Sequence, residues 1–243
     1  MSAPASGITS LSIVIPVHNE AAILDAHVRE IVRELESRAL PAWEVLLVEN
    51  GSRDNTREIA TRLATADPRV KVVALDAANY GLALQAGMLA ATGEVICNFD
   101  IDYWDVEFLE IAALVMRVKY DIVIGSKTML QSRDHRGPLR RVVSFGFRIL
   151  LFTVFDLRVS ETHGIKAWRN TPAMRSLFST SEPTPHTFDT EVILRAARLG
   201  HAILEIPVEI RETRATKRHI LQRIPAAARD LARLFVRLRQ APR

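Results

Sequence analysis

Apolar residues in the first half of this chain fall into short uninterrupted runs, separated by segments with helical periodicity. Runs without alternation are typical of strands buried on both faces of a sheet. Between the first two runs, Leu24, Val28, Ile31 and Leu35 recur at helical spacing. Strands that alternate with helices in this way favour parallel pairing with right-handed crossovers. The strand-like runs lie at 11–16, 45–48, 70–75, from 95 and at 121–125.

The pattern changes after Gly125, where the runs become less regular. We expect one α/β domain with a Rossmann-like, mostly parallel sheet flanked by helices, followed by an amphipathic helix from Ile220 with apolar residues on one face and arginines on another. The predicted division is a flexible leader at 1–10, the domain at 11–218 and the basic C-terminal helix at 219–243. Within 126–218 the pattern predicts a polar loop at 126–138, helices at 139–155 and 188–199, and strands at 164–168 and 202–210.

Composition narrows the setting in which the chain works. Its 243 residues suffice for one large domain, and the single cysteine, Cys97, excludes an intramolecular disulfide framework and fits a reducing compartment. No stretch reaches the run of about 18 apolar residues of a membrane span. The net charge of +4 is concentrated towards the C-terminus, which suggests an anionic partner. We expect a cytoplasmic protein, with contact at the cytoplasmic face of a membrane as an open alternative.

Two carboxylates one residue apart, Asp100 and Asp102, follow the central apolar run that begins at Val95. Ligands of open α/β sheets bind outside the carboxyl ends of the strands, where these side chains fall. Converging carboxylates repel each other unless a cation lies between them, and Mg²⁺ or Mn²⁺ is the natural choice. The structural alternative is that the two aspartates begin a helix at Val106.

Four polar motifs follow successive predicted strands in order: PVHNE at 16–20, ENGSRDNT at 49–56, NYGLA at 79–83 and DID at 100–102. In this arrangement the chain resembles a family 2 glycosyltransferase of the GT-A type. Later motifs are similar to the branch that contains dolichyl-phosphate mannosyltransferase and the polyprenyl-phosphate glycosyltransferases. These are GS at 125–126, RxxS at 141–144, GIK at 164–166 and EIPV at 205–208. The resemblance covers roughly residues 11–218.

The resemblance implies roles for individual residues. Asp100 and Asp102 would hold the Mg²⁺ or Mn²⁺ ion that bridges the diphosphate of a nucleoside-diphosphate sugar, and 11–125 would be the nucleotide-binding half. The residues implied to line the nucleotide pocket are Pro16, Val17, Asn19, Glu20, Glu49, Asn50, Gly51, Asn79, Gly81, Asp100 and Ile101.

The second half, 126–218, would bind the acceptor. The implied ligands of an acceptor phosphate are Lys127, Arg141 and Ser144, with Arg211 and Lys217 in a closing loop. Arginine suits phosphate because its fork of donors matches two oxygens. The implied catalytic residues are Asp102, Arg141 and Glu161, and Glu161 ranks ahead of Asp189 and Glu191 as a general base. A phosphate acceptor is already ionised, so the use of a base stays open.

The chain departs from the family pattern at four positions. Glu49 and Asn50 stand where the family usually has two aspartates, Trp104 replaces a glutamine, and Arg214 replaces a small residue. The expected function is inverting transfer of a sugar to a polyprenyl phosphate. Two alternatives remain: a soluble family 2 enzyme that acts on a small molecule, peptide or saccharide, and a nucleotide-sugar-binding protein without catalysis. The sugar, the base and the oligomeric state stay open. Nucleic acid is an improbable partner, because aromatic residues are not interleaved with the basic ones.

Overall fold

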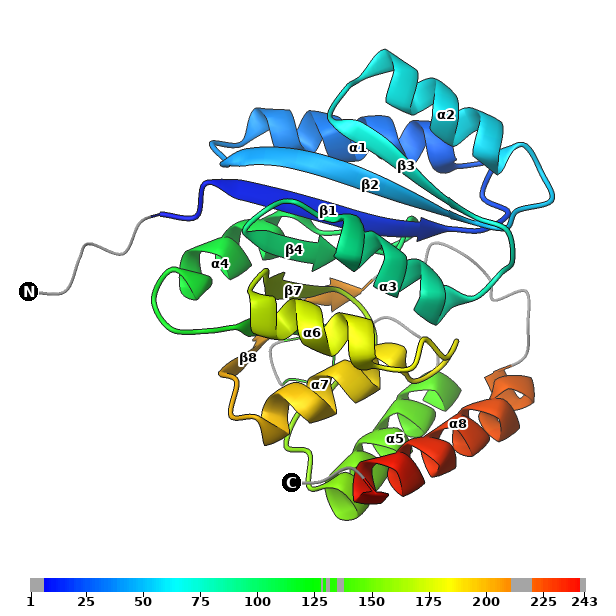
Figure 1. The fold of residues 1–243 in the computed structure, drawn as a ribbon, viewed down its shortest axis with the longest axis vertical. Helices are drawn as coiled ribbons and strands as arrows, with labels where there is room; N and C mark the ends of the chain where they lie inside the picture. Colours follow the sequence, from blue (N-terminus) through cyan, green and yellow to red (C-terminus); the bar gives the residue numbers. More distant parts are fainter. Residues whose placement is uncertain (1–6, 128, 130–131, 135–137, 211–219, 241–243) are drawn as a thin grey trace, which may run out of the picture.

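A computed structural model describes residues 7–127, 129, 132–134, 138–210 and 220–240. Its centre is a seven-stranded sheet in the order β3-β2-β1-β4-β7-β5-β8 (Figure 1). The strands are β1 Ser10–Val17, β2 Ala42–Asn50, β3 Val70–Leu75, β4 Val95–Asn98, β5 Ile122–Ser126, β7 Lys166–Arg169 and β8 Ile203–Pro207, and β6 Arg133–Asp134 pairs separately with β9 Glu209–Ile210. The expected α/β fold is confirmed.

The sheet is mostly parallel, as predicted, but β7 runs antiparallel between β4 and β5. Neighbouring strands along β3-β2-β1-β4 are parallel, and so are β5 and β8. The insertion of β7 places the segment before Lys166 beside the end of β4. Residues from the second half of the chain therefore reach the carboxyl edge of the first half.

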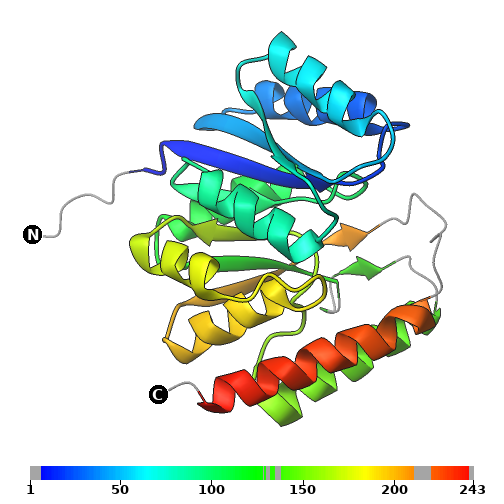
Figure 2. The same cartoon turned by 45° about the vertical axis from the view of Figure 1, so that its right-hand side comes forward.

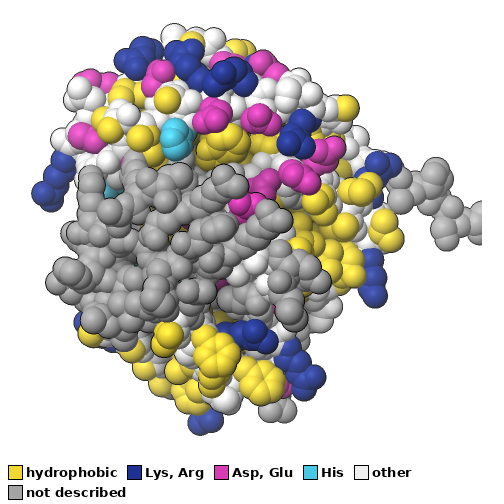
Figure 3. Space-filling view, turned by 180° about the vertical axis from the view of Figure 1, so that it is seen from behind, with side chains coloured by type: hydrophobic (Ala, Val, Ile, Leu, Met, Phe, Trp, Pro, Cys, Tyr) yellow, Lys and Arg dark blue, Asp and Glu magenta, His cyan; other side chains and the backbone are white. Residues whose placement is uncertain are grey.

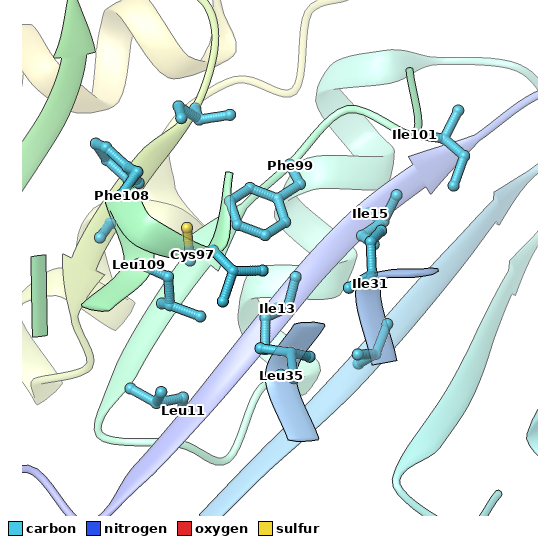
Figure 4. Close-up of a cluster of buried hydrophobic side chains, with 14 of the residues drawn as sticks. Leu11, Ile13, Ile15, Ile31, Leu35, Cys97, Phe99, Ile101, Phe108 and Leu109 are labelled. Carbon is cyan, nitrogen blue, oxygen red and sulfur yellow. The ribbon is translucent and has the colours of Figure 1, made fainter. Parts of the chain in front are cut away.

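Helices cover both faces of the sheet. Their bounds are α1 Leu24–Ser37, α2 Thr56–Ala66, α3 Tyr80–Ala90, α4 Val106–Met116, α5 Pro138–Phe155, α6 Pro172–Thr180, α7 Phe188–Arg198 and α8 Ile220–Gln240. One core packs α1, α2 and α4 against the sheet, and Figure 4 shows part of it around Ile13, Cys97 and Phe99. The other core contains buried residues of α3, α5, α6, α7 and α8.

The two long helices of the second half, α5 and α8, pack side by side at one end of the molecule (Figures 1 and 2). The rings of Phe155 and Phe235 meet edge to face, with centroids 5.8 Å apart. Arg237, on the basic face of α8, binds Glu182 at 2.6 Å and Glu191 at 2.8 Å. Part of the basic face of α8 therefore holds this helix on the domain. No helix in the described part of the chain is both long and apolar enough to cross a membrane.

Candidate active site

The predicted site residues of the first half gather at one edge of the sheet, because β1, β2 and β4 are parallel and end there. Three loops follow these strands, and the start of α3 lies beside them. Strand β1 ends with Pro16 and Val17, and the loop after it carries His18 to Glu20. The loop after β2 carries Gly51, and the turn after β4 carries Asp100 to Asp102. This edge is where an open α/β sheet binds its ligand.

Asp100 is held in a tight turn by its own backbone, whose N–H and C=O both bond to Tyr103. The Tyr80 hydroxyl donates a hydrogen bond of 3.0 Å to the Asp100 carboxylate. Burial and then the charge of Asp102 raise the pKa of Asp100, and Lys127 opposes the rise. A buried carboxylate whose ionisation is opposed by a second carboxylate suits a divalent cation, which neutralises both. The donors present therefore fit Mg²⁺ or Mn²⁺.

The alternative explanation for the two aspartates, a helix cap, does not describe this turn. The residue that caps α4 is Asp105, whose side chain accepts a hydrogen bond of 3.0 Å from Phe108 N. Asp100 and Asp102 precede that cap. Their carboxylates are consequently not used to begin the helix.

Hydrogen bonds tie the loops after β1 and β2 together. Asn19 adopts a positive φ of 54°, which lets its N–H donate to Ser52 Oγ and its side-chain oxygen accept from Arg53 N. His18 Nδ1 lies 2.8 Å from the Asn50 carbonyl. Glu20 N donates to Thr56 Oγ1 over 2.8 Å. The two loops therefore form one preorganised wall at the sheet edge.

The side chains of Glu49 and Asn50 stabilise this wall through hydrogen bonds to other parts of the protein. Glu49 is fully buried, and its two oxygens accept hydrogen bonds from Ser52 N at 2.6 Å and Arg57 Nε at 2.8 Å. The Asn50 side-chain oxygen accepts from Asn79 N at 2.8 Å. The oxygens expected to read the nucleotide are thus engaged by the protein. Gly51 has a φ of 63°, and a Cβ there would lie 2.9 Å from backbone atoms of the β3–α3 connection.

The start of α3 joins the two halves of the chain. Asn79 caps the helix by accepting from Leu82 N, and its amide donates to the Pro183 carbonyl over 2.9 Å. A Cβ on Gly81 would lie 2.1 Å from the Thr184 carbonyl oxygen, so only glycine fits without a shift. These two predicted nucleotide-site residues also set the distance between the first half and the loop before α7.

A cluster of charged residues from the second half lies next to this edge. Lys166 is completely buried, and its ammonium contacts the Gly164 carbonyl at 2.6 Å and Asp189 Oδ2 at 3.2 Å. His163 Nδ1 lies 3.3 Å from the same Asp189 oxygen. Burial opposes ionisation of Asp189, but His163 and Lys166 outweigh it and lower the pKa of this carboxyl well below its usual range. Glu161, also buried, accepts a hydrogen bond from His163 N.

The predicted acceptor ligands are only partly visible. Lys127 lies at the cluster, because a Cβ on Gly164 would be 3.0 Å from its Nζ. Ser144 is half-buried on α5. Arg141 belongs to α5, but its side chain lies outside the described atoms, and Arg211, Arg214 and Lys217 lie outside the described residues.

Sequence reasoning did not single out Tyr80 or Lys166 as functional side chains. Tyr80 bonds to Asp100, and burial followed by the charges of Asp100 and Asp189 raises its pKa well above 10. A tyrosine at a helix start offers no separate signal for this contact. Lys166 is part of the GIK motif, but the sequence does not show that this lysine is completely buried.

A Rossmann-like sheet with paired aspartates after its central strand defines the class: this is a GT-A glycosyltransferase fold. The Glycosyl transferase family 2 model matches residues 12–178. The chain belongs to glycosyltransferase family 2, and the resemblance seen in its motifs is confirmed.

Curated proteins that are similar to this chain include dolichyl-phosphate glucosyltransferases. The chain is 34% identical to glycosyltransferase AglD of Haloferax volcanii over 99% of its own length, but it spans only 39% of that protein. It is 30% identical to dolichyl-phosphate beta-glucosyltransferase ALG5C of Trichomonas vaginalis, covering 93% of this chain and 71% of the relative. The human dolichyl-phosphate beta-glucosyltransferase is 28% identical, with 94% and 75% covered.

Solved structures share the fold at low identity. Glucosyl-3-phosphoglycerate synthase from Mycobacterium tuberculosis, in complex with Mn²⁺ and UDP, superimposes with a TM-score of 0.69 at 19% identity, over 99% of this chain and 83% of that one. Mannosyl-3-phosphoglycerate synthase from Rubrobacter xylanophilus gives 0.70 at 16% identity, over 96% and 74%.

Proposed function

We propose that the protein is a metal-dependent inverting glycosyltransferase that moves a hexose from a nucleoside-diphosphate sugar to a polyprenyl phosphate. The observation that carries this proposal is the opposition of two kinds of charge at one sheet edge. Asp100 and Asp102 lie beside a basic cluster, since Asn98 at the end of β4 donates to the Gly164 carbonyl, which Lys166 also contacts and Lys127 approaches. A carboxylate pair suits a metal-bound diphosphate, and a basic side suits a second phosphate. The names of the dolichyl-phosphate relatives support the same acceptor class.

Asp100 and Asp102 would hold Mg²⁺ or Mn²⁺, which when bound neutralises the charge that develops on the leaving diphosphate. We propose that the end of β1 with Pro16 and Val17, the loops after β1 and β2 with Glu20, and the residues near Gly81 and Ile101 form the nucleotide pocket. The described residues contain no cluster of three potential metal-ligating side chains. Diphosphate oxygens and water would therefore complete the coordination shell.

Transfer with inversion needs an acceptor oxygen opposite the leaving diphosphate. An oxygen of the acceptor phosphate forms the new bond to the anomeric carbon while the bond to the diphosphate breaks, and the nucleoside diphosphate leaves with the bonding electrons. Because a phosphate monoester is already ionised near neutral pH, no side chain has to remove a proton. Glu161 and Asp189 are engaged by His163, which suits positioning of the basic side. We therefore assign the binding of the acceptor phosphate to Lys127, Arg141 and Ser144, and we extend this assignment to Arg211 and Lys217.

We further propose that the enzyme works at a membrane surface, in keeping with its lipid-linked acceptor. The outer face of α5 leaves large apolar side chains in solvent: Phe145 is 60% exposed and Phe152 is 54% exposed. Figure 3 shows apolar side chains gathered at this end beside basic ones. Phe145 and Phe152 line a groove with a volume of about 620 Å³, and Arg148 and Arg158 line this groove as well. Apolar side chains bordered by arginines are typical of helices that lie in an anionic headgroup layer.

The proposal is tested by measuring sugar transfer from a panel of nucleotide sugars, with Mg²⁺ or Mn²⁺, in the presence and absence of a short-chain polyprenyl phosphate. The proposal predicts turnover only with the lipid phosphate. Lipid-independent transfer to a small molecule would indicate the soluble enzyme instead. Nucleotide binding without turnover under any condition would indicate a binding protein.

A further inference from the structure

The contact between His163 and Asp189 extends the basic side of the site. The carboxylate can only accept, so the imidazole donates from Nδ1, and in a protonated ring Nε2 carries a second N–H donor. The His163 side chain is 45% exposed, whereas Asp189 and Lys166 are buried behind it. The ring is therefore the part of this cluster that a ligand can reach.

The position of the ring is set by α5 and by the end of β4. Phe147 stacks on His163 with ring centroids 5.3 Å apart and an interplanar angle of 27°. Ser144 lies three residues earlier on α5, on the same helix face, and Arg141 lies one turn before Ser144. Asn98 at the end of β4 donates to the carbonyl of Gly164, the next residue after His163. His163 thus lies between the proposed acceptor helix and the strand that leads to Asp100.

Charged groups face the ring from each element that packs around it. Asp189 comes from α7, Lys166 from β7 and Glu161 from the same loop, while Lys127, from the segment after β5, approaches the neighbouring Gly164. The contacting residue of α5, Phe147, is uncharged. Burial and Lys166 oppose protonation of His163, but the carboxylates of Asp189 and Glu161 prevail and raise its pKa above 6.5. A cationic imidazole is therefore the form that this surrounding favours.

We propose that His163, oriented by Asp189, is a cationic ligand of the acceptor phosphate. The inference rests on the proposed function and adds to it a phosphate-binding residue outside the arginine and serine positions. A protonated imidazole donates a charge-assisted hydrogen bond from Nε2 to a phosphate oxygen while Nδ1 keeps its bond to Asp189. As pH rises and the ring loses its proton, this donor is lost. Acceptor binding then weakens, whereas nucleotide-sugar binding at the opposite side does not.

The test compares wild type with His163→Asn, and it uses His201→Asn as the matched control. His201 makes the same kind of contact, with Nδ1 3.2 Å from Asp121 Oδ2, but it lies before β8, away from the carboxyl edge. Acceptor and donor KM values are measured between pH 5.5 and 9, and binding of a short-chain polyprenyl monophosphate is measured by calorimetry at pH 6 and pH 8.5. The ionisation of the acceptor phosphate is the same in every experiment at a given pH. The ratio of the variant's acceptor dissociation constant to that of wild type therefore reports on His163 alone.

At pH 6 the His163→Asn variant should bind the acceptor roughly 10- to 100-fold more weakly than wild type, in line with the loss of a hydrogen bond to a charged group. The ratio should fall towards one at pH 8.5, with the donor KM unchanged. The His201→Asn variant should match wild type throughout. A pH-independent ratio, or a ratio of one at pH 6, overturns the inference.

Failure of the proposed function would look different. If wild type binds the polyprenyl phosphate in a His163-dependent way but never transfers sugar to it, the ligand assignment stands and the function fails. If wild type neither binds nor uses it, both fail. If His163→Asn does not fold, His163→Gln supplies the same ratio to wild type, because the wild-type profile alone also contains the ionisation of the acceptor phosphate.

Discussion

Glu44 gives the most quantitative prediction about the stability of this fold. Its carboxylate is 7% exposed and links β2 to its neighbours. One oxygen accepts from Ser12 Oγ at 2.6 Å and from both N and Oγ1 of Thr92 at 2.8 Å, and the other accepts from Lys71 Nζ at 2.6 Å. Burial opposes its ionisation, but Lys71 and then the hydroxyl and amide donors lower the pKa of Glu44 from 4.5 to about 2.

The size of the effect follows from linkage. A pKa of about 2 in the folded state and 4.5 in the unfolded state corresponds to roughly 3 kcal/mol of stability, at about 1.36 kcal/mol per pKa unit. Because the folded-state pKa is the lower one, this stability is fully present above the unfolded-state value. It is lost as pH falls from about 4.5 towards about 2. At pH 3 roughly 2 kcal/mol of it is already gone.

Urea unfolding of wild type and Glu44→Gln at pH 7 and pH 3 measures this. The substitution should cost about 3 kcal/mol at pH 7 and about 2 kcal/mol less than that at pH 3. Glu34→Gln is the control. Glu34 is 46% exposed and lies as far as 3.7 Å from Arg38 Nε, so the loss of this weak ion pair should cost close to zero. An equal cost of Glu44→Gln at both pH values would show that ionised Glu44 does not stabilise the folded state.

Two further predictions concern the joint between the halves and the outer face of α5. Gly81→Ala places a Cβ against the Thr184 carbonyl, so it should lower the unfolding free energy by about 1–3 kcal/mol in a urea titration; an unchanged midpoint would show that the contact is looser than described. Replacing Phe145 and Phe152 together by serine should reduce sedimentation with anionic phosphatidylserine vesicles about tenfold or more without loss of stability. Serine at Leu114, which is 60% exposed on α4, should leave vesicle binding unchanged, and equal effects at both places would contradict the docking face.

Much of the fold could be predicted because its signals are local. Buried parallel strands are uninterrupted apolar runs, and β3 begins and ends at the predicted residues, Val70 and Leu75. The antiparallel direction of β7 could not be predicted, since the short run at 166–169 does not specify its neighbours. Helix α6 was missed although Thr171 caps it and Pro172 occupies its first turn, a signal that was present in the sequence.

The site shows the same division between local and distant information. Asp100 and Asp102 could be singled out because they follow a strand and stand one residue apart. The engagement of Glu49 by Arg57 needed the structure, because the identity of a carboxylate does not show whether its oxygens are already used. The contact of His163 with Asp189 joins residues 26 positions apart on different elements. A lone histidine in a sequence offers no such partner, so the role proposed for His163 rests on its packing.

Asp100 and Asp102 are proposed to support transfer of a sugar to a lipid phosphate. The most direct measurement is nucleoside-diphosphate release with Mn²⁺, with and without a short-chain polyprenyl phosphate, by wild type, Asp102→Ala and the control Asp105→Asn. Asparagine preserves the helix cap, so Asp105→Asn should release diphosphate at a rate close to wild type. We expect lipid-dependent release that falls by about 100-fold or more in Asp102→Ala. Release by Asp102→Ala at the wild-type rate, or wild-type release that is indifferent to the lipid, would contradict the account.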